Sequence, residues 1–190
     1  MTECIALLRG INVGRAKRVA MADLRELVAG LGHANVRTVL NSGNVVFGAA
    51  RGDTGALAAA IAAGIEARFG FASWVVVVTA AELAAVVQEN PLLDVATNPS
   101  RLLVAFVAQP AVLDAAGPLL RESWAPDRLA VGRRAAYLWC ADGVIGSRLS
   151  QAFGRQFGET ATTRNWSTVL KLQAAASSRP GRYGRVGCVQ

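Results

Sequence analysis

The sequence has few of the residues that carry metal, redox and acid–base chemistry. Among its 190 residues are one histidine, His33, and three cysteines, Cys4, Cys140 and Cys188, which are too far apart for a paired metal or redox motif. The 13 acidic residues are scattered, and no two have the spacing of an acid–base pair. Glycine-rich phosphate loops, dinucleotide fingerprints and nucleophile elbows are also absent. The sequence therefore identifies no catalytic residue, metal site or cofactor, and it argues against hydrolytic and metal chemistry.

Long apolar runs are absent too. No stretch reaches the length that crosses a bilayer, and the first residues lack the basic segment and apolar run of a secretory signal. The three unpaired cysteines suit a reducing compartment. These features predict a cytoplasmic protein with no membrane partner.

Lysine is scarce, whereas arginine is abundant. Only Lys17 and Lys171 are lysines among 20 basic residues, which exceed the acidic ones to give a net charge of +7. A positive field attracts phosphates, so a nucleic acid is a candidate partner. Richness in arginine and alanine is also typical of GC-rich coding, so charge alone defines no site. Hydrophobic residues make up 53% of the chain and charged residues 17%, which predicts a folded globular protein.

The first half of the chain is predicted to be an antiparallel sheet with helices. Apolar runs predict strands, leucines at helical spacing predict helices, and Asn41-Ser42-Gly43-Asn44 is strong turn chemistry for a hairpin. The resulting order is the split β-α-β, or ferredoxin-like, pattern. A third helix follows, capped by Thr79 with Glu82 as its capping-box partner. The predicted strands are 3–8, 35–40, 45–47 and 74–78, and the predicted helices are 21–31, 53–69 and 80–89.

The second half repeats this element order without repeating the sequence. Prolines mark 91–101 as the boundary, so we predict an α+β fold with one ferredoxin-like half over 1–90 and another, with C-terminal helices, over 91–176. Residues 177–190 are rich in Arg, Gly and Ser and predict a flexible tail. The fourth strand of this half is expected to be absent or displaced. The predicted strands are 102–107, 128–131 and 135–140, and the predicted helices begin near 110 and span 147–157 and 163–176.

A polar loop follows the first strand and is the best candidate for a binding site. In the predicted topology strands one and two are parallel with strand three between them, so this loop lies beside the hairpin at 41–44. The helix beginning at Met21 starts near the same edge, where its free amides favour an anion. The hairpin residues also have a purely structural interpretation, as turn formers. The candidate ligand-binding residues are Arg9, Gly10, Asn12, Gly14 and Lys17 in the loop, and Ser42, Gly43 and Asn44 in the hairpin.

A third polar cluster lies at Thr162–Thr168. Thr162 or Thr163 is a natural helix cap, which would place Arg164 and Asn165 in the first helical turn, where an anion is favoured and an arginine gives no stability. This mismatch points to function, so Arg164, Asn165 and Trp166 are further candidates. Trp166 would either stack on a base or pack in the core. The sequence does not establish whether this cluster joins the first-half site.

Three segments together resemble a known family. Residues 5–14 (IALLRGINVG), 41–47 (NSGNVVF) and 163–169 (TRNWSTV) are similar to the bacterial family called domain of unknown function 1697, and the match runs in order along nearly the whole chain. The resemblance implies two ferredoxin-like halves and no established activity. The sequence departs from the family pattern at Arg15, where a second glycine is common after Gly14, so a very close approach of backbone to phosphate is not expected.

These features predict a binding module for a phosphate-bearing ligand, either a nucleotide or a nucleic acid. The predicted site is the polar edge formed by the loop after the first strand and the hairpin at 41–44. Sheet-face RNA binding is disfavoured because strands one and three offer only Phe47 for stacking. The alternative is a small-molecule enzyme in which Arg9, Asn12, Ser42 and Arg164 position an anionic substrate between the halves. A scaffold or dimer with polar subunit contacts is also open, and the sequence leaves the oligomeric state undetermined.

Overall fold

The first half is an antiparallel four-stranded sheet covered on one face by two helices. The computed structural model describes residues 1–12, 17–50 and 53–178, so Gly14 and residues 179–190 of the predicted tail lie outside the described residues. The strands are ordered β2-β3-β1-β4, with β3 between the parallel β1 and β2, as predicted. The elements are β1 (Thr2–Leu8), α1 (Met21–Gly30), β2 (Ala34–Thr38), β3 (Asn44–Ala49), α2 (Thr54–Phe69) and β4 (Val75–Thr79).

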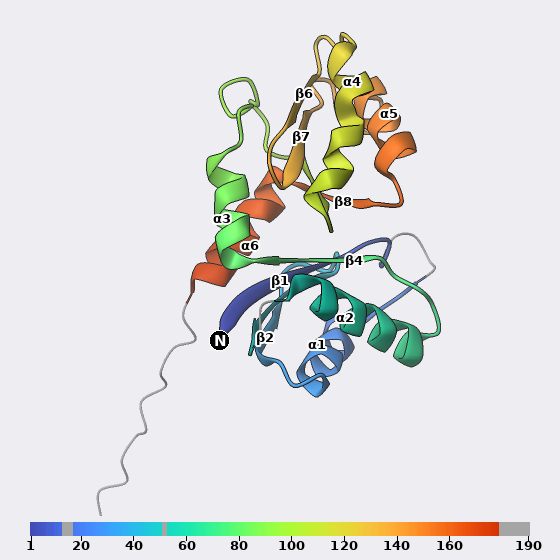
Figure 1. Cartoon of the computed structure of the whole chain (residues 1–190), viewed down its shortest axis with the longest axis vertical. Coiled ribbons are helices and arrows are strands. Elements are labelled where there is room, and N and C mark those ends of the chain that lie inside the picture. The colour runs from blue at the N-terminus through green and yellow to red at the C-terminus, as the bar shows by residue number, and fades with distance from the viewer. Residues whose placement is uncertain (13–16, 51–52, 179–190) are drawn as a thin grey trace, which may run out of the picture.

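The second half has the same sheet topology. Its strands are ordered β6-β7-β5-β8, and all neighbouring pairs are antiparallel. Figure 1 shows its helices α4 and α5 on one side of the strands β6 and β7, opposite the helices α3 and α6. The α+β class with two ferredoxin-like halves is therefore confirmed. The elements are β5 (Leu102–Val107), η1 (Pro110–Ala116), α4 (Gly117–Arg121), β6 (Arg128–Val131), β7 (Ala135–Trp139), α5 (Arg148–Phe157) and β8 (Ala161–Asn165).

The fourth strand of the second half, expected to be absent or displaced, is β8. Residues 161–165 pair with β5 from Leu103 to Val107, and the β-branched threonines within them favour a strand over a helix. The last helix, α6 (Trp166–Ser177), therefore begins three residues later than predicted. Its cap is Asn165, whose side chain accepts a hydrogen bond from the Thr168 amide, so the assignment of Thr162 or Thr163 as the cap was wrong. Arg164 accordingly lies in a strand and not in a helical turn.

The two halves share one hydrophobic core. The sheet faces that do not carry α1, α2, α4 and α5 contribute to a single cluster, with Ile5 and Val76 from the first sheet and Val104 from the second. The helices α3 (Ala80–Gln88) and α6 complete this cluster and contact each other, as Figure 1 shows at the junction of the halves. Each fully buried side chain of this kind contributes roughly 1.5–3 kcal/mol. The halves therefore stabilise each other through α3 and α6.

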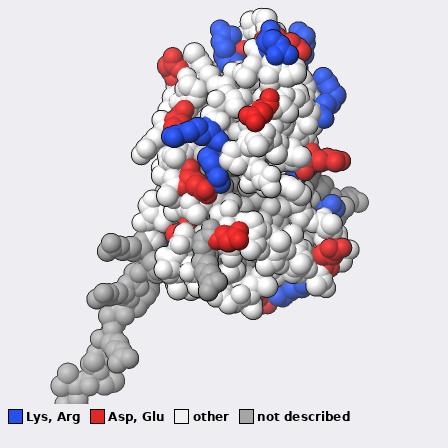
Figure 2. Space-filling model, viewed as in Figure 1, with Lys and Arg blue, Asp and Glu red and all other residues white. Residues whose placement is uncertain are grey.

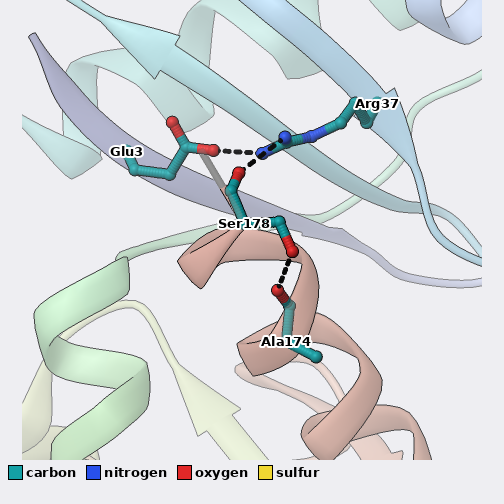
Figure 3. Close-up of polar contacts among 4 residues, drawn as sticks. All are labelled: Glu3, Arg37, Ala174 and Ser178. Atoms are coloured by element: carbon teal, nitrogen blue, oxygen red, sulfur yellow. Dashed lines mark hydrogen bonds and ion pairs between the residues drawn. The ribbon is translucent and has the colours of Figure 1, made fainter. Parts of the chain in front are cut away.

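Both helices of the junction are fixed at their ends. The capping box predicted for α3 is present, with Thr79 accepting from the Glu82 amide and Glu82 accepting from the Thr79 amide. The end of α6 is attached to the first sheet (Figure 3), because Arg37 on β2 donates to the Ser178 carbonyl (3.2 Å) and pairs with Glu3 on β1. These contacts hold the C-terminal end of α6 against the first sheet. None of the helices in the described part of the chain has the length and apolar character needed to cross a membrane.

Candidate functional site

The end of β1 and the 41–44 hairpin are in direct contact, as the topology predicted. The Leu8 amide donates to the Gly43 carbonyl at 2.8 Å. Gly43 has a φ of 72°, and a Cβ added there would lie 2.9 Å from the Leu8 Cβ. Only glycine combines this left-handed backbone with so close an approach. The hairpin is therefore held against β1 by its own turn geometry.

Asn12 closes the loop that follows β1. Its side-chain amide donates to the Val19 carbonyl (2.9 Å) and the Asn41 carbonyl (3.0 Å), while its oxygen accepts from the Val19 amide (2.9 Å). Both amide hydrogens are thus used within the protein, and the backbone adopts a left-handed φ of 56°. Lys17 extends elsewhere, toward the Ala72 carbonyl (3.4 Å). Asn12 thus ties the loop to the start of α1 and to the hairpin.

Arg164 connects the two halves. From β8 its guanidinium donates through Nε to the Asn44 side chain and through Nη2 to the Leu8 carbonyl (2.7 Å), with the Ser42 and Gly43 carbonyls at 3.3 Å. Through Nη1 it donates to the Thr162 hydroxyl and the Thr163 carbonyl. All five N–H groups of the guanidinium therefore have acceptors in the protein. The third polar cluster does join the first-half site, and Arg164 makes the connection.

None of these acceptors carries a negative charge. Burial lowers the pKa of Arg164 to about 10, so the guanidinium remains protonated at neutral pH. A charge that is hydrogen-bonded only to neutral oxygens is satisfied in geometry but not neutralised. It leaves a positive potential where the halves meet.

A cleft of about 470 Å³ opens at this junction, which we call the inter-half cleft. Its volume falls within the range of roughly 300–1,000 Å³ that is typical of small-molecule sites. Residues from three separated parts of the chain form its walls. They are residues 8–11 after β1, Ser42 of the hairpin, 153, 154, 157 and 158 of α5 and its end, 161–165 of β8, and Thr168 of α6.

Arg9 lies at this cleft with its side chain exposed to solvent. Its backbone is fixed, because its amide donates to the Trp74 carbonyl (2.8 Å) and its carbonyl accepts from the Ser73 hydroxyl (3.0 Å). The guanidinium reaches across to α5, where Nη2 lies 3.7 Å from the position that a Cβ on Gly158 would occupy. It makes no side-chain hydrogen bond or ion pair with any other residue that the structure describes. Arg9 thus combines a backbone that is fixed by hydrogen bonds with guanidinium donors that no described residue uses.

Hydroxyl groups supply further donors inside the cleft. The Thr162 side chain is buried and accepts from Arg164, which leaves its own hydrogen without a described acceptor. Thr168 is 7% exposed, and its hydroxyl has no hydrogen-bond partner within the described residues. Ser42 accepts from the Asn44 amide. The lining just described contains no carboxylate, so the cleft offers donors and positive charge to an anion.

The remaining predicted site residues divide between cleft and core. Gly10 and Asn165 line the cleft, and Asn165 does so while capping α6. Trp166 is 8% exposed and belongs to the shared core, in keeping with the packing interpretation. Gly14 lies outside the described residues. The α5 wall was not predicted, and Thr168 belongs to the predicted polar cluster without being named as a candidate, because the proximity of both to Arg9 arises only when the two halves meet.

The fold and the cleft define a class of α+β protein with two ferredoxin-like halves and a cationic, donor-rich cleft between them. Within this class the chain belongs to the family described as "Protein of unknown function (DUF1697)", whose model matches residues 1–137. A solved structure, that of the conserved bacterial protein SP0830 from Streptococcus pneumoniae, is similar to the chain with a TM-score of 0.77 and 20% identity, covering 92% of this chain and 98% of the other. At this identity the likeness establishes the fold alone. No curated protein matches the chain.

Proposed function

We propose that the chain is a binding module for a small phosphate-bearing ligand, with the inter-half cleft as its site. The observation that carries the proposal is the exposed Arg9 guanidinium, which has no carboxylate or carbonyl partner among the described residues and lines the same cleft as the hydroxyls of Thr162 and Thr168. Arginine suits phosphate because its planar fork matches two oxygens at once. Arg164 adds positive potential without spending donors on the ligand.

A small ligand is favoured over a nucleic acid by where the charge lies. Figure 2 shows blue and red side chains interspersed over one face of the molecule. A polymer needs a continuous basic track along its backbone. A cleft of about 470 Å³ instead suits one phosphate-bearing molecule.

The enzyme alternative would use the same cleft. It needs a nucleophile with a base, or an acid–base pair, within hydrogen-bond reach of the substrate. The hydroxyls of Ser42, Thr162 and Thr163 line the cleft, but no histidine, cysteine or carboxylate is among its described lining residues. Binding is therefore the function that the cleft supports better.

Thermal unfolding with a panel of anions tests the proposal. Inorganic phosphate, pyrophosphate, ribose 5-phosphate, nucleoside monophosphates and sulfate are each titrated against the full chain. A ligand present at one hundred times its Kd stabilises the folded state by about 2.7 kcal/mol, so the melting temperature rises with the logarithm of concentration. We expect phosphate compounds to raise it, and Arg9→Ala to abolish the rise.

The matched control is Arg155→Ala, since Arg155 is exposed on α5 and does not line the inter-half cleft. This variant should keep the full ligand response. A panel with no stabilising phosphate compound contradicts the proposal, as does equal stabilisation of Arg9→Ala and the unmodified chain. If Arg9→Ala unfolds without ligand, Arg9 is structural and the site is wrongly assigned.

A further inference from the structure

Gly154 has no structural reason to be glycine. It lies at the start of the last turn of α5, and a Cβ added there would meet no atom within 4 Å. Glycine inside a helix costs about 0.5–1 kcal/mol relative to alanine because the unfolded chain is freer, so the fold alone favours a substitution. Gly154 lines the inter-half cleft. The space that its absent side chain leaves open therefore belongs to the cleft.

Gly158, one helical turn further along, differs from Gly154. A Cβ there would collide with the carbonyl oxygen of Gly154, so the end of α5 requires this glycine. The Arg9 guanidinium lies over Gly158, at 3.7 Å from that Cβ position. Residues four apart share one face of a helix, so Gly154 and Gly158 form a flat strip of backbone along the cleft. Arg9 covers one end of the strip and leaves the other end open.

The lining beside this strip is apolar, whereas the lining from β8 and α6 carries hydroxyl groups. Phe153 and Phe157 on α5 and Ile11 after β1 line the cleft beside the strip, and all three are buried. The part of the lining that comes from β8 and α6 presents the hydroxyls of Thr162 and Thr168. A ligand that satisfies both parts of the lining carries an anionic group and a flat apolar group. A guanidinium such as that of Arg9 also stacks on planar rings.

We infer that the inter-half cleft takes a nucleoside monophosphate, with the base against the α5 backbone at Gly154 and the phosphate bound by Arg9, Thr162 and Thr168. This inference rests on the proposed function and names the ligand class for the same cleft. Gly154 acts as a specificity determinant: it admits the flat base and has no part in holding the phosphate. A sugar phosphate has no group for the strip and binds more weakly.

Calorimetric titration of the full chain tests the inference with four probes, namely adenosine monophosphate, adenosine, ribose 5-phosphate and inorganic phosphate. The variants are Gly154→Ala and Gly154→Leu. The control is Gly30→Ala, at an exposed helical glycine of α1 that also has open space around it and lies away from the cleft. Both alanine variants should raise the melting temperature without ligand by about 2 °C, since each gains helix propensity.

The affinities then separate base recognition from phosphate recognition. We expect Gly154→Leu to lower the affinity for adenosine monophosphate on the order of tenfold or more, because the leucine side chain fills the space over the strip. Gly154→Ala should lower this affinity less, and Gly30→Ala should leave it unchanged. Inorganic phosphate should bind all variants alike. Equal affinity of ribose 5-phosphate and adenosine monophosphate, or an equal loss for every probe in Gly154→Leu, overturns the inference while the proposed function stands. Failure of every phosphate probe to bind the unmodified chain overturns both.

Discussion

Two pairs of arginines lie where the halves meet, and they differ in their partners. Arg133 and Arg134, in the turn between β6 and β7, pair with Glu89 and Glu82 at α3, with Arg134 Nη2 at 2.8 Å from the Glu82 carboxylate. We call this the paired junction. Arg9 and Arg164, at the inter-half cleft, have no carboxylate partner within the described residues.

The comparison separates structural charge from charge that remains for a ligand. At the paired junction each guanidinium is offset by a carboxylate, and the hydrogen bond from Arg133 lowers the pKa of Glu89. At the cleft, Arg164 is satisfied by neutral oxygens and keeps its charge. A charge left without a counter-charge reduces stability unless something else compensates. Under the proposed function a bound anion supplies the counter-charge at the inter-half cleft.

The largest expected effect is that of Arg164→Ala. The change leaves the Leu8 carbonyl and the Asn44 side chain without the donor that joins the halves. Unsatisfied buried acceptors cost about 1–3 kcal/mol each, so we expect a loss of about 3–4 kcal/mol in the free energy of unfolding. Urea denaturation measures this as a lower midpoint.

Arg164→Lys serves as the companion variant, because it keeps the charge and loses the fork. It should be nearly as destabilised as the alanine variant, since one ammonium cannot reach acceptors on both sides. A loss below about 1 kcal/mol for Arg164→Ala means that Arg164 does not join the halves. The two arginine pairs would then not differ in the way described.

Gly43→Ala should rank second, because it disturbs the turn that presents acceptors to Arg164. The new Cβ would lie 2.9 Å from both the Leu8 Cβ and the Ile11 side chain, at a φ of 72°. We expect a loss of about 2–3 kcal/mol from strain and overpacking together. Gly10→Ala is the control, since Gly10 has a φ of 71° and no atom within 4 Å of the added Cβ. If both variants lose the same free energy of unfolding, only the backbone strain matters.

The sequence predicted much of the fold because its signals were local. Leucines at helical spacing, the Asn41–Asn44 turn and the Thr79 capping box each define an element from neighbouring residues, and together they specify the first half. β8 was missed because Thr162 and Thr163 suit a helix cap as well as a strand, and only pairing with β5 decides between them. Long-range pairing is not encoded in a local pattern.

The candidate site was predicted in part for the same reason. Arg9 and Ser42 follow from β1 lying beside the hairpin, which the order of elements implies. Thr168 enters the cleft because the shared core places α6, and Gly154 enters it because α5 packs on the sheet of the second half. A glycine within a helix is a weak signal in sequence, and it acquires meaning once the space around it is known.

Tyr137→Phe tests the paired junction, where Tyr137 of β7 donates to the Val86 carbonyl of α3 at 2.8 Å. At neutral pH the variant should lose about 1–2 kcal/mol of stability, because a buried carbonyl loses its donor.

Burial raises the pKa of Tyr137 to about 12 from 10.0. The folded state therefore favours the protonated phenol, so this stability is complete below pH 10 and declines as the pH rises toward 12. Chemical denaturation from pH 8 to 11 should show a shallower alkaline decline for the phenylalanine variant than for the unmodified chain; identical slopes would contradict the assignment.

The smallest effect is expected from Arg134→Ala, because the two side chains of its ion pair with Glu82 are 29% and 28% exposed. A pair that water reaches contributes less than about 1 kcal/mol, and added salt screens it further. We therefore expect a small loss in the free energy of unfolding that shrinks as sodium chloride is raised.

Arg9→Ala, which removes a guanidinium with no described counter-charge, should show no such dependence in the absence of ligand. A salt-sensitive loss in Arg9→Ala would reveal a carboxylate partner for Arg9, and the distinction between the two arginine pairs would no longer hold. The same denaturation series at low and high salt decides it, because a charge with a partner and a charge without one respond differently to screening.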